Sequence, residues 1–482
     1  MPVALGLDLG TTSISAVAVA QDGRLVGRVT KAHRADVSGL PSGHAEQSPT
    51  TILDVALEAL REIADALTQT PVCLGITGQM HGVVLTDETL TPLSNLITWQ
   101  DKRPLEIAGD GTTWLERFRS LCNDAAVRRT GCNPSAGYLG VTLFTLDGRG
   151  DLPVAARNAL LLADWVAATL AAAKPLTDRT NAASTGLYDL EQDAWSSIVD
   201  DTGVLRALLP DIAESGAILG GLNHDLAAKA GLPIGLPIAC AIGDHQAAVL
   251  GSLPAGESAV HINIGTGGQV SLPVSRFLRT ATSDTRYLPD GRYLLVGAGL
   301  AGGDAYAWVR RTVSEWLSAF GVERSDDEVF ETLNRLAERV PPGCEGLRAE
   351  PFFRGTRREP ERRAVFSGVS GENFSPGHVA RAVFEGIAAA LAGFADDHAR
   401  RPEVADRFGR VIATGNAVRR NPLLAASLAR AFQLPVFTSE HEEEAAYGAA
   451  VLAGLRAGVW KDLTEVGATF RLIQAAAPSD TN

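Results

Sequence analysis

One short pattern occurs twice in this chain: an apolar, strand-like run that ends in a Gly-Thr turn. The two copies are Val3-Ala4-Leu5-Gly6-Leu7-Asp8-Leu9-Gly10-Thr11-Thr12 and Ala259-Val260-His261-Ile262-Asn263-Ile264-Gly265-Thr266-Gly267-Gly268. Because glycine has no side chain, the backbone N–H groups and the Thr hydroxyl of such a turn can approach an oxyanion. One Gly-Thr turn is more often only a turn, but two that face each other would hold a polyphosphate. We therefore expect the phosphates of a nucleotide to be bound by Gly10, Thr11, Thr12, Gly265 and Thr266.

The length of the chain predicts two domains, with one copy of the repeated turn in each. Single hydrophobic cores stop growing at roughly 250 to 300 residues, and this chain has 482. Two prolines, Pro233 and Pro237, and a turn at Gly243 mark the expected division, which gives domains 1–242 and 243–482. The site should then lie in the cleft between the domains, at the carboxyl ends of the strands.

Composition narrows the class of protein. A formal net charge of −13 argues against nucleic acid or an anionic membrane as the main partner, because both require a basic surface. The five Cys are odd in number and contain no CxxC pair, which indicates a reduced chain in the cytoplasm. The most apolar stretches are interrupted by polar or charged residues, so we expect no membrane segment. Disorder is expected only for Ser479 to Asn482.

Periodicity predicts similar α/β elements in the two halves. In the first half we expect a strand over residues 3–8, a hairpin over 15–29, a helix that begins after Ser48 as N-cap, and a strand over 72–77. In the second half we expect strands over residues 258–264, 269–272, 293–296 and 410–414, and an amphipathic helix over 377–399. This order suits mixed sheets that are flanked by helices.

Two aspartates stand at the ends of apolar strands, where they suit phosphoryl-transfer chemistry. Asp8 directly precedes the first Gly-Thr turn, and a carboxylate beside phosphates requires a cation, so we predict that it helps to hold Mg²⁺. The simpler alternative is an Asp that caps the turn. Asp244 is the candidate general base, which would accept the proton of a sugar hydroxyl during phosphoryl transfer. An N-cap of the following helix is the alternative for Asp244, and one Asp can serve both roles.

Three further segments have compositions that suit ligand recognition. Gly78-Gln79-Met80-His81-Gly82 combines polar side chains with two glycines, which suits a loop that reads a polyol through hydrogen bonds. Trp99-Gln100-Asp101 adds an aromatic face of the kind that covers sugars, although a core Trp is an equal alternative. Thr414-Gly415-Asn416 resembles a strand–turn–helix that faces a nucleotide. The acidic run Glu442-Glu443-Glu444 is expected to be solvated at a helix N-terminus.

Together these segments resemble the FGGY carbohydrate kinases, which belong to the actin and sugar-kinase ATPase superfamily. The resemblance runs nearly end to end. It rests on Asp8-Leu9-Gly10-Thr11-Thr12, Ala45-Glu46-Gln47-Ser48-Pro49, Gly78-Gln79-Met80-His81-Gly82, Asn181-Ala182-Ala183-Ser184, Gly243-Asp244-His245-Gln246-Ala247, Ile264-Gly265-Thr266 and Glu444 through Ala450. It implies an α/β fold of two RNase-H-like domains with a central cleft.

The resemblance also implies a role for each candidate residue. Asp8 would help to hold Mg²⁺, the two Gly-Thr turns would hold the ATP phosphates, and Asp244 would be the catalytic base. The sugar pocket would be lined by Gln79, Met80, His81, Asp101 and Asp244. The adenosine would lie beside Gly415, Asn416 and Asn421. The reaction implied is ATP-dependent phosphorylation of a terminal hydroxyl on an open-chain ketose or polyol.

Within the family, the Gln-Met-His loop narrows the sugar chiefly to sedoheptulose or xylulose. Segments such as Thr98-Trp99-Gln100-Asp101 favour sedoheptulose, and xylulose is the alternative. Gly355-Thr356-Arg357-Arg358 departs from the Gly-Glu-Arg segment that is frequent in the family. Sugar and ATP are the expected partners, and a homodimer is one assembly compatible with the sequence.

Two other classes of protein stay open on the sequence. An ATPase of the actin or chaperone type would use the same phosphate turns, but it gives no reason for the loop over Gln79 to His81. A sugar-binding regulator without catalysis usually carries a helix-turn-helix, for which we expect no room before Val3.

Overall fold

The computed structural model describes residues 1–253, 258–353, 355, 359, 361–401, 404 and 408–478. The predicted disorder of Ser479 to Asn482 lies outside these residues. The departure from the family pattern at 355–358 also lies outside them, except for Gly355.

The described first half is built on a seven-stranded mixed sheet with the order β13-β14-β5-β1-β2-β3, in which β15 also pairs with β5. Its strands are β1 (Val3–Leu9), β2 (Ser13–Ala20), β3 (Leu25–Ala32), β5 (Cys73–Gly78), β13 (Ile218–Gly221), β14 (Pro237–Ala239) and β15 (Ile242–Gly243). The predicted first strand, hairpin and buried strand are confirmed. The predicted helix is α1 (Pro49–Ala66), whose N-cap Ser48 accepts a hydrogen bond from the Thr51 N–H. Helices α1, α5 (Leu162–Ala171) and α8 (His224–Ala230) bury their apolar faces against this sheet.

The second half repeats this plan in a sheet of the order β18-β19-β17-β16-β22-β23-β24. Its strands are β16 (Val260–Ile264), β17 (Gly268–Val274), β18 (Asp284–Tyr287), β19 (Tyr293–Leu300), β22 (Val411–Thr414), β23 (Val436–Ser439) and β24 (Leu472–Ala476). The packed helices are α10 (Gly303–Ala319), α11 (Asp326–Glu338), α12 (Pro376–Ala399), α13 (Asn416–Arg420) and α14 (Pro422–Phe432). All four predicted strands and the long amphipathic helix are confirmed.

The sequence repeat is a repeat of structure. In each half the strand before the Gly-Thr turn pairs antiparallel with the strand after it, as β1 with β2 and β16 with β17. Each of these first strands also has a parallel neighbour on its other side, β5 or β22. The two turns therefore occupy equivalent positions, each at the end of the first strand of its hairpin.

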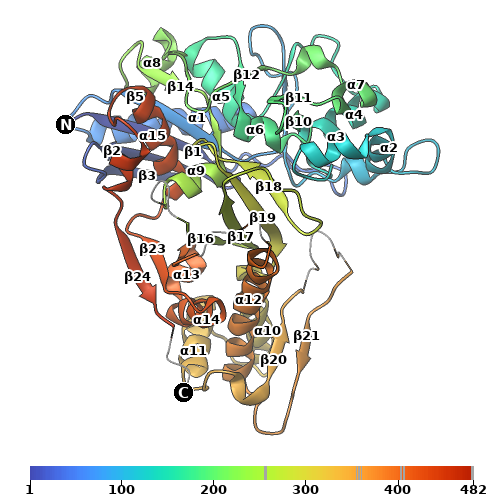
Figure 1. Ribbon diagram of the computed structural model, residues 1–482, viewed down its shortest axis with the longest axis vertical. Helices are drawn as coiled ribbons and strands as arrows, with labels where there is room; N and C mark the ends of the chain where they lie inside the picture. Colours follow the sequence, from blue (N-terminus) through green and yellow to red (C-terminus); the bar gives the residue numbers. More distant parts are fainter. Residues whose placement is uncertain are drawn as a thin grey trace.

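Smaller elements form a side lobe on the first half, to the upper right in Figure 1. They include α2 (Trp114–Leu121), α3 (Asp124–Arg129), α4 (Leu139–Arg149), α6 (Arg179–Ser184), α7 (Ile198–Thr202), β10 (Tyr188–Asp189) and β11 (Ala194–Trp195). Short pairs add β4 (Glu46–Gln47) with β7 (Leu96–Ile97), β6 (Val84–Thr86) with β8 (Asn158–Leu160), and β9 (Leu176–Asp178) with β12 (Asp211–Ala213). In the second half, β20 (Arg348–Glu350) pairs with β21 (Val365–Ser367), and β20 packs against α12.

The chain returns to the first half near its end, which the sequence did not predict. Helix α15 (Glu444–Arg456) follows β23 of the second sheet but packs against β1, β5 and α9 (Asp244–Leu250). Figure 1 shows α15, in red, among the blue strands of the first half. The contact is close, because a Cβ at Gly6 would lie 1.9 Å from the Ala446 carbonyl oxygen. The two halves are therefore joined by more than the link after Leu253, and the division proposed at 242/243 falls within β15 of the first sheet.

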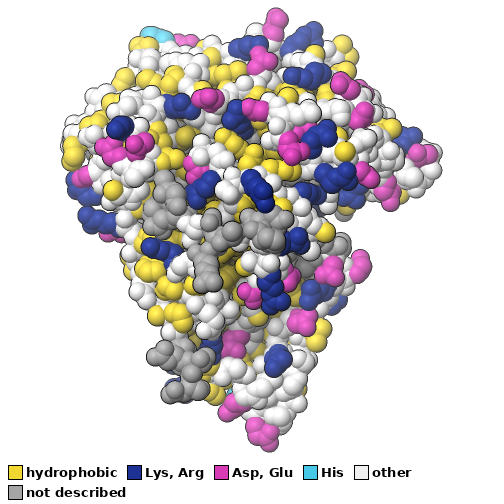
Figure 2. Space-filling view, viewed as in Figure 1, with side chains coloured by type: hydrophobic (Ala, Val, Ile, Leu, Met, Phe, Trp, Pro, Cys, Tyr) yellow, Lys and Arg dark blue, Asp and Glu magenta, His cyan; other side chains and the backbone are white. Residues whose placement is uncertain are grey.

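Charged side chains of both signs cover the surface, and the most apolar long helix is buried in a core. Figure 2 shows Lys and Arg side chains interspersed with Asp and Glu over the described residues of one face. Among the described residues, α12 is the one helix that is long and apolar enough to cross a membrane. Its Val383, Ile387 and Leu391 are buried in the core of the second half, where α12 packs against α11 and α14.

Candidate functional site

A cavity of about 440 Å³ lies between the two halves and is lined by half of the residues predicted for the site. The first half contributes Thr11, Gln79, Met80, His81 and Trp99, and the second sheet contributes Gly265 through Gln269. Asp244, His245 and Gln246, at the start of α9, complete the wall that joins these groups. Both halves of the chain thus supply side chains to one cleft, as the repeated turns predicted.

The two Gly-Thr turns are held by hydrogen bonds from outside their own hairpins. The Gly10 carbonyl oxygen lies 3.2 Å from His33 Nε2, and the Thr11 carbonyl accepts a bond of 2.8 Å from Gln47 Nε2. On the other turn, the Gly303 N–H at the start of α10 donates to the Gly265 carbonyl at 2.9 Å. A Cβ at Gly265 would meet no described atom within 4 Å, so this turn leaves open space on the cleft side.

Asp8 carries a buried oxygen that the described protein does not satisfy. Its Oδ1 has no hydrogen-bond partner there. Burial, together with the nearby carboxylates of Asp244 and Glu443, raises the pKa of Asp8 to about 8. A cation beside Asp8 would give Oδ1 a partner and would stabilise the charged form of the carboxylate. Among the described residues, no group of three or more His, Cys, Asp or Glu side chains is arranged to hold a metal ion, so a cation there would need ligands from phosphate or water.

Asp244 stands at the first position of α9 and borders the cleft. Its Oδ1 accepts a hydrogen bond of 2.7 Å from the His245 N–H. Burial raises the pKa of Asp244 to about 6, which suits a group that must take up a proton near neutral pH. The preceding Gly243 N–H donates to Thr180 Oγ1 at 2.8 Å, which anchors the backbone before the carboxylate.

Hydrogen bonds connect the predicted sugar loop to the first phosphate turn. Gln79 Nε2 donates to Gln47 Oε1 at 2.8 Å, and Gln47 in turn donates to the Thr11 carbonyl. Trp99, 39% exposed, donates from Nε1 to Thr11 Oγ1 at 3.2 Å and lines the cleft. Of the two alternatives for Trp99, the structure supports the ligand-facing one.

His81 adopts a backbone conformation that is rare for a residue with a side chain. Its φ is +76°, and its ring stacks on Tyr138 with the ring centroids 4.3 Å apart. The distance from His81 Nδ1 to the Ser184 carbonyl oxygen is 2.7 Å, so Nδ1 donates this bond. Strain of this kind persists where the surroundings hold it, frequently at functional sites.

Several buried polar atoms that border the cleft lack a partner in the described protein. They are Gln79 Oε1 and both polar atoms of the Gln246 amide. Each unsatisfied buried group costs about 1–3 kcal/mol, so such groups are rare unless a ligand completes them. The set contains both a donor and acceptors, and hydroxyl groups can satisfy both kinds.

Sequence reasoning missed several residues of this cleft. Gln246 was seen only as a member of the Asp244 motif, and Gln269, Asp284 and Arg286 were not singled out. Asp284 and Arg286 come from β18, a short strand without a turn motif. The signal available for Gln246 was its position two residues after the candidate base.

Asp101 is the predicted sugar residue that the structure does not bring to the cleft. It is fully buried, and its carboxylate accepts bonds from the Ala45 N–H at 2.8 Å and from Arg103 Nε at 2.9 Å. Arg103 also pairs with Glu46 at 2.5 Å. Because Arg103 follows only two residues later, its guanidinium group is close enough to bind the Asp101 carboxylate. In this structure Asp101 holds the segment that precedes α1, and its contact with the sugar stays a prediction.

The residues predicted beside adenosine lie next to the second turn. Asn416 and Asn421 line a separate cavity of about 270 Å³, together with Gly303, Tyr306 and Phe384. Gly303 belongs to this cavity and also donates to Gly265, so the cavity adjoins the phosphate turn. At Gly415, φ is +91° and a Cβ would lie 2.5 Å from the Ile264 carbonyl oxygen, so this close approach requires glycine.

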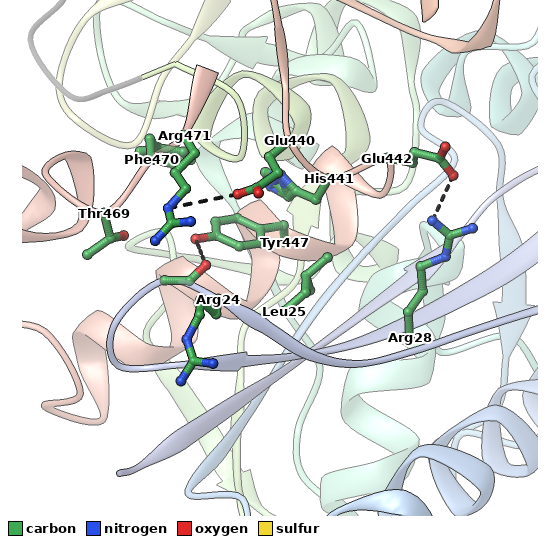
Figure 3. A pocket seen from close by; sticks show the side chains of 11 residues that line it. Arg24, Leu25, Arg28, Glu440, His441, Glu442, Tyr447, Thr469, Phe470 and Arg471 are labelled. Atoms are coloured by element: carbon green, nitrogen blue, oxygen red, sulfur yellow. Dashed lines mark hydrogen bonds and ion pairs between the residues drawn. The ribbon is translucent and has the colours of Figure 1, made fainter. Parts of the chain in front are cut away.

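The acidic run before α15 is not wholly solvated, contrary to prediction. Glu442 is exposed, but Glu444 is buried and pairs with Arg419 of α13. Figure 3 shows a second cavity, of about 410 Å³, beside this run. Two ion pairs lie within it, Arg28 with Glu442 at 2.7 Å and Arg471 with Glu440 at 3.9 Å, and Tyr447 donates to the Gly23 carbonyl at 2.8 Å. These contacts tie the β2–β3 hairpin to the crossover into α15.

The chain was compared with protein families and with known proteins. Residues 3–251 match the N-terminal domain of the FGGY family of carbohydrate kinases, and residues 258–457 match its C-terminal domain. Human sedoheptulokinase is 29% identical over 491 residues, which cover 94% of this chain and 97% of that protein. A glycerol kinase of Trichlorobacter lovleyi is 30% identical over 499 residues, covering 99% and 95% of the two chains.

A solved structure supports the fold. The crystal structure of xylulose kinase from Rhodospirillum rubrum superposes with a TM-score of 0.86 at 24% identity, covering 99% of this chain and 94% of that one. The two family matches together span most of the chain, and the cleft brings both of its phosphate turns together. The chain therefore belongs to the FGGY family of carbohydrate kinases and is an ATP-dependent sugar kinase.

Proposed function

We propose that this kinase phosphorylates sedoheptulose to sedoheptulose 7-phosphate. The observation that carries the proposal is the set of unsatisfied amide atoms of Gln79 and Gln246, which border the same cleft as Asp244 and the second phosphate turn. These atoms suit a polyhydroxylated substrate. The similarity to human sedoheptulokinase along nearly the whole chain favours the seven-carbon sugar.

Asp244 is the general base of the proposed reaction. As the terminal hydroxyl oxygen of the sugar forms its bond to the γ-phosphorus of ATP, its O–H bond breaks and Asp244 takes the proton. The bond between the γ-phosphorus and the bridging oxygen breaks, and ADP leaves with that electron pair. Gln79, Met80 and His81 orient the sugar, and Asn416 and Asn421 adjoin the adenosine.

Mg²⁺ is proposed as the metal ion, with Asp8 as the residue that would help to hold it. The unsatisfied Oδ1 of Asp8 fits a hydrated cation, since Mg²⁺ in such sites uses one or two carboxylates with water and phosphate oxygens. When bound, it would neutralise charge on the phosphate oxygens. The backbone of the two turns, Gly10 to Thr12 and Gly265 to Thr266, would hold the same phosphates.

The setting that we propose is the cytoplasm, with the sugar and ATP as partners. Five free cysteines, four of them buried, suit a reducing compartment. Xylulose remains the second candidate substrate, because the Gln-Met-His loop suits that sugar as well.

The proposal is tested by measuring ADP release from ATP and Mg²⁺ with sedoheptulose, xylulose, ribulose or glycerol, beside a control without sugar. We expect the highest kcat/KM with sedoheptulose. A clear preference for xylulose would change the proposed substrate to xylulose and leave the proposed mechanism unchanged. Release of ADP at the same rate without any sugar would contradict phosphoryl transfer to a sugar altogether.

A further inference from the structure

Two charged residues lie at the end of the cleft that is remote from the nucleotide strands. Asp284 and Arg286 belong to β18, the edge strand of the second sheet, and both line the cleft. The second phosphate turn joins β16 to β17, and the sheet order is β18-β19-β17-β16-β22. Neighbouring strands are about 4.8 Å apart, so β18 lies roughly 14 Å across the sheet from β16.

Arg286 is held rigidly although it borders a cavity. It is 6% exposed, Nη1 donates to the Ala183 carbonyl at 3.1 Å, and Nη2 donates to the Tyr138 hydroxyl at 3.2 Å. Both partners lie in the first half, Ala183 on α6 and Tyr138 just before α4. A guanidinium fixed in this way presents its donors in one orientation.

The same contacts connect Arg286 to the sugar loop. Tyr138, which accepts from Arg286, stacks on His81, and His81 donates to Ser184, the next residue after Ala183. The predicted sugar loop, Gln79 to His81, and the Arg286 guanidinium group therefore form one continuous wall of the cleft.

A carboxylate compensates part of the positive charge of this subsite. Arg286 Nη2 lies 3.4 Å from Asp284 Oδ2, and Arg279 Nη1 lies 3.9 Å from Asp284 Oδ1. The pair of Arg286 and Asp284 offers both donors and acceptors, which suits the hydroxyl groups of a neutral sugar. A carboxylate on the substrate would meet the repulsion of Asp284.

We propose that Arg286 and Asp284 bind the end of the sugar remote from the transferred phosphoryl group, and that this subsite gives the enzyme a preference for seven-carbon over five-carbon ketoses. The inference rests on the proposed function. A sugar whose terminal hydroxyl is fixed at Asp244 extends from α9 toward β18. Two additional hydroxymethylene groups carry it further toward Arg286, whereas a pentulose leaves the subsite to water. A site built to pair with hydroxyl groups discriminates strongly against a substrate that lacks them.

The test compares kcat/KM for sedoheptulose and xylulose in wild type and in Arg286→Met, which removes the donors but keeps most of the bulk. We expect a loss on the order of 10²-fold with sedoheptulose and less than about fivefold with xylulose, because only the longer sugar loses charged hydrogen bonds. Arg276→Gln, at an exposed position on the connection between β17 and β18, is the matched control and should change neither value.

The ratio of the two sugars separates specificity from structural damage. Disturbance of α6 or Tyr138 would lower both values by the same factor, and an unchanged ratio would overturn the inference. If wild type shows no sugar-dependent turnover with any ketose, the proposed function fails and the inference fails with it. Normal wild-type turnover with an unchanged ratio in Arg286→Met overturns the inference alone.

Asp284→Asn tests the charge balance independently. This variant keeps the shape of the side chain but leaves the Arg286 charge uncompensated. We expect gluconate, a sugar acid, to inhibit the variant with a Ki at least about tenfold lower than for wild type, the effect of a charge pair worth roughly 1.4 kcal/mol. Equal inhibition of the two proteins would contradict the role of Asp284 in repelling a carboxylate.

Discussion

At the scale of single residues, burial prepares Asp244 for its role and keeps its neighbour neutral. Burial raises the pKa of Asp244 to about 6, whereas it lowers the pKa of His245 to about 3. His245 Nε2 lies 2.9 Å from Ser271 Oγ, and Gln269 Nε2 approaches His245 Nδ1 at 3.4 Å. The imidazole is thus neutral and engaged, and Asp244 is the group whose proton affinity suits catalysis.

The pKa of Asp244 predicts the acid limb of the pH profile. Below pH 6 the carboxyl is protonated and cannot accept a proton, so kcat/KM should fall about tenfold per pH unit there and level off above it. The same shift has the opposite sign for stability. This group stabilises the fold most below pH 3.8, and the contribution is lost as the pH rises through 6. A profile of kcat/KM from pH 4.5 to 8 checks the first statement, and activity that stays constant down to pH 4.5 would contradict it.

Substitution of Gln246 by Leu should make the protein more stable but weaken its binding of the sugar. Its buried amide lacks partners in the described protein, so Gln246→Leu removes an unsatisfied polar group and should raise the free energy of unfolding by about 1–3 kcal/mol. The same change should raise KM for the sugar at least about tenfold, since a hydrogen bond to the ligand is lost. Thermal unfolding and steady-state kinetics test the two effects. A stable variant with an unchanged KM would show that Gln246 does not contact the sugar.

At the scale of elements, the close packing of α15 joins the halves of the molecule. A Cβ at Gly448 would lie 1.9 Å from the Ala247 carbonyl oxygen of α9, the helix that begins with Asp244. The small residues of α15 permit close packing, but composition alone does not say which sheet the helix meets. The periodic strands, α1 and α12 were predictable because local patterns determine them. The position of α15 depends on contacts distant in sequence.

We predict that Gly448→Ala destabilises the protein by about 1–3 kcal/mol, because the helix and α9 must separate to admit the methyl group. Gly393→Ala is the matched control within α12. A Cβ there meets no described atom within 4 Å, so this change should stabilise by about 0.5–1 kcal/mol. Urea unfolding of both variants measures the difference. Equal effects would contradict the close packing of α15 on α9.

Residues of the candidate site could be predicted from the sequence where they lie in a recognisable turn or at the end of a strand. Asp8, Gln79 and Asp244 each end or follow a buried strand. Arg286 was not predictable, since β18 has no motif and its approach to the cleft depends on the fold of the second sheet. The position of Asp101 away from the cleft follows from a local contact, because its carboxylate accepts a hydrogen bond from Arg103 of the same segment.

At the scale of the whole molecule, the reaction requires ligands to contact both halves at once. One Gly-Thr turn and the predicted sugar loop belong to the first half, and the other turn and the cavity predicted to hold adenosine belong to the second. The crossover into α15 is tied to β3 by the ion pair of Arg28 and Glu442, which joins the two halves (Figure 3). Closure of the halves around both ligands would exclude water, which otherwise competes with the sugar for the phosphoryl group.

The central claim is that Asp244 takes the proton of a sugar bound across this cleft. The most direct measurement is sugar-dependent ADP release by wild type and Asp244→Asn, with ATP binding followed by calorimetry. We predict that the variant binds ATP with an affinity within a few-fold of wild type and turns over at least about 10²-fold more slowly. Turnover near the wild-type rate, with intact sugar dependence, would contradict the account.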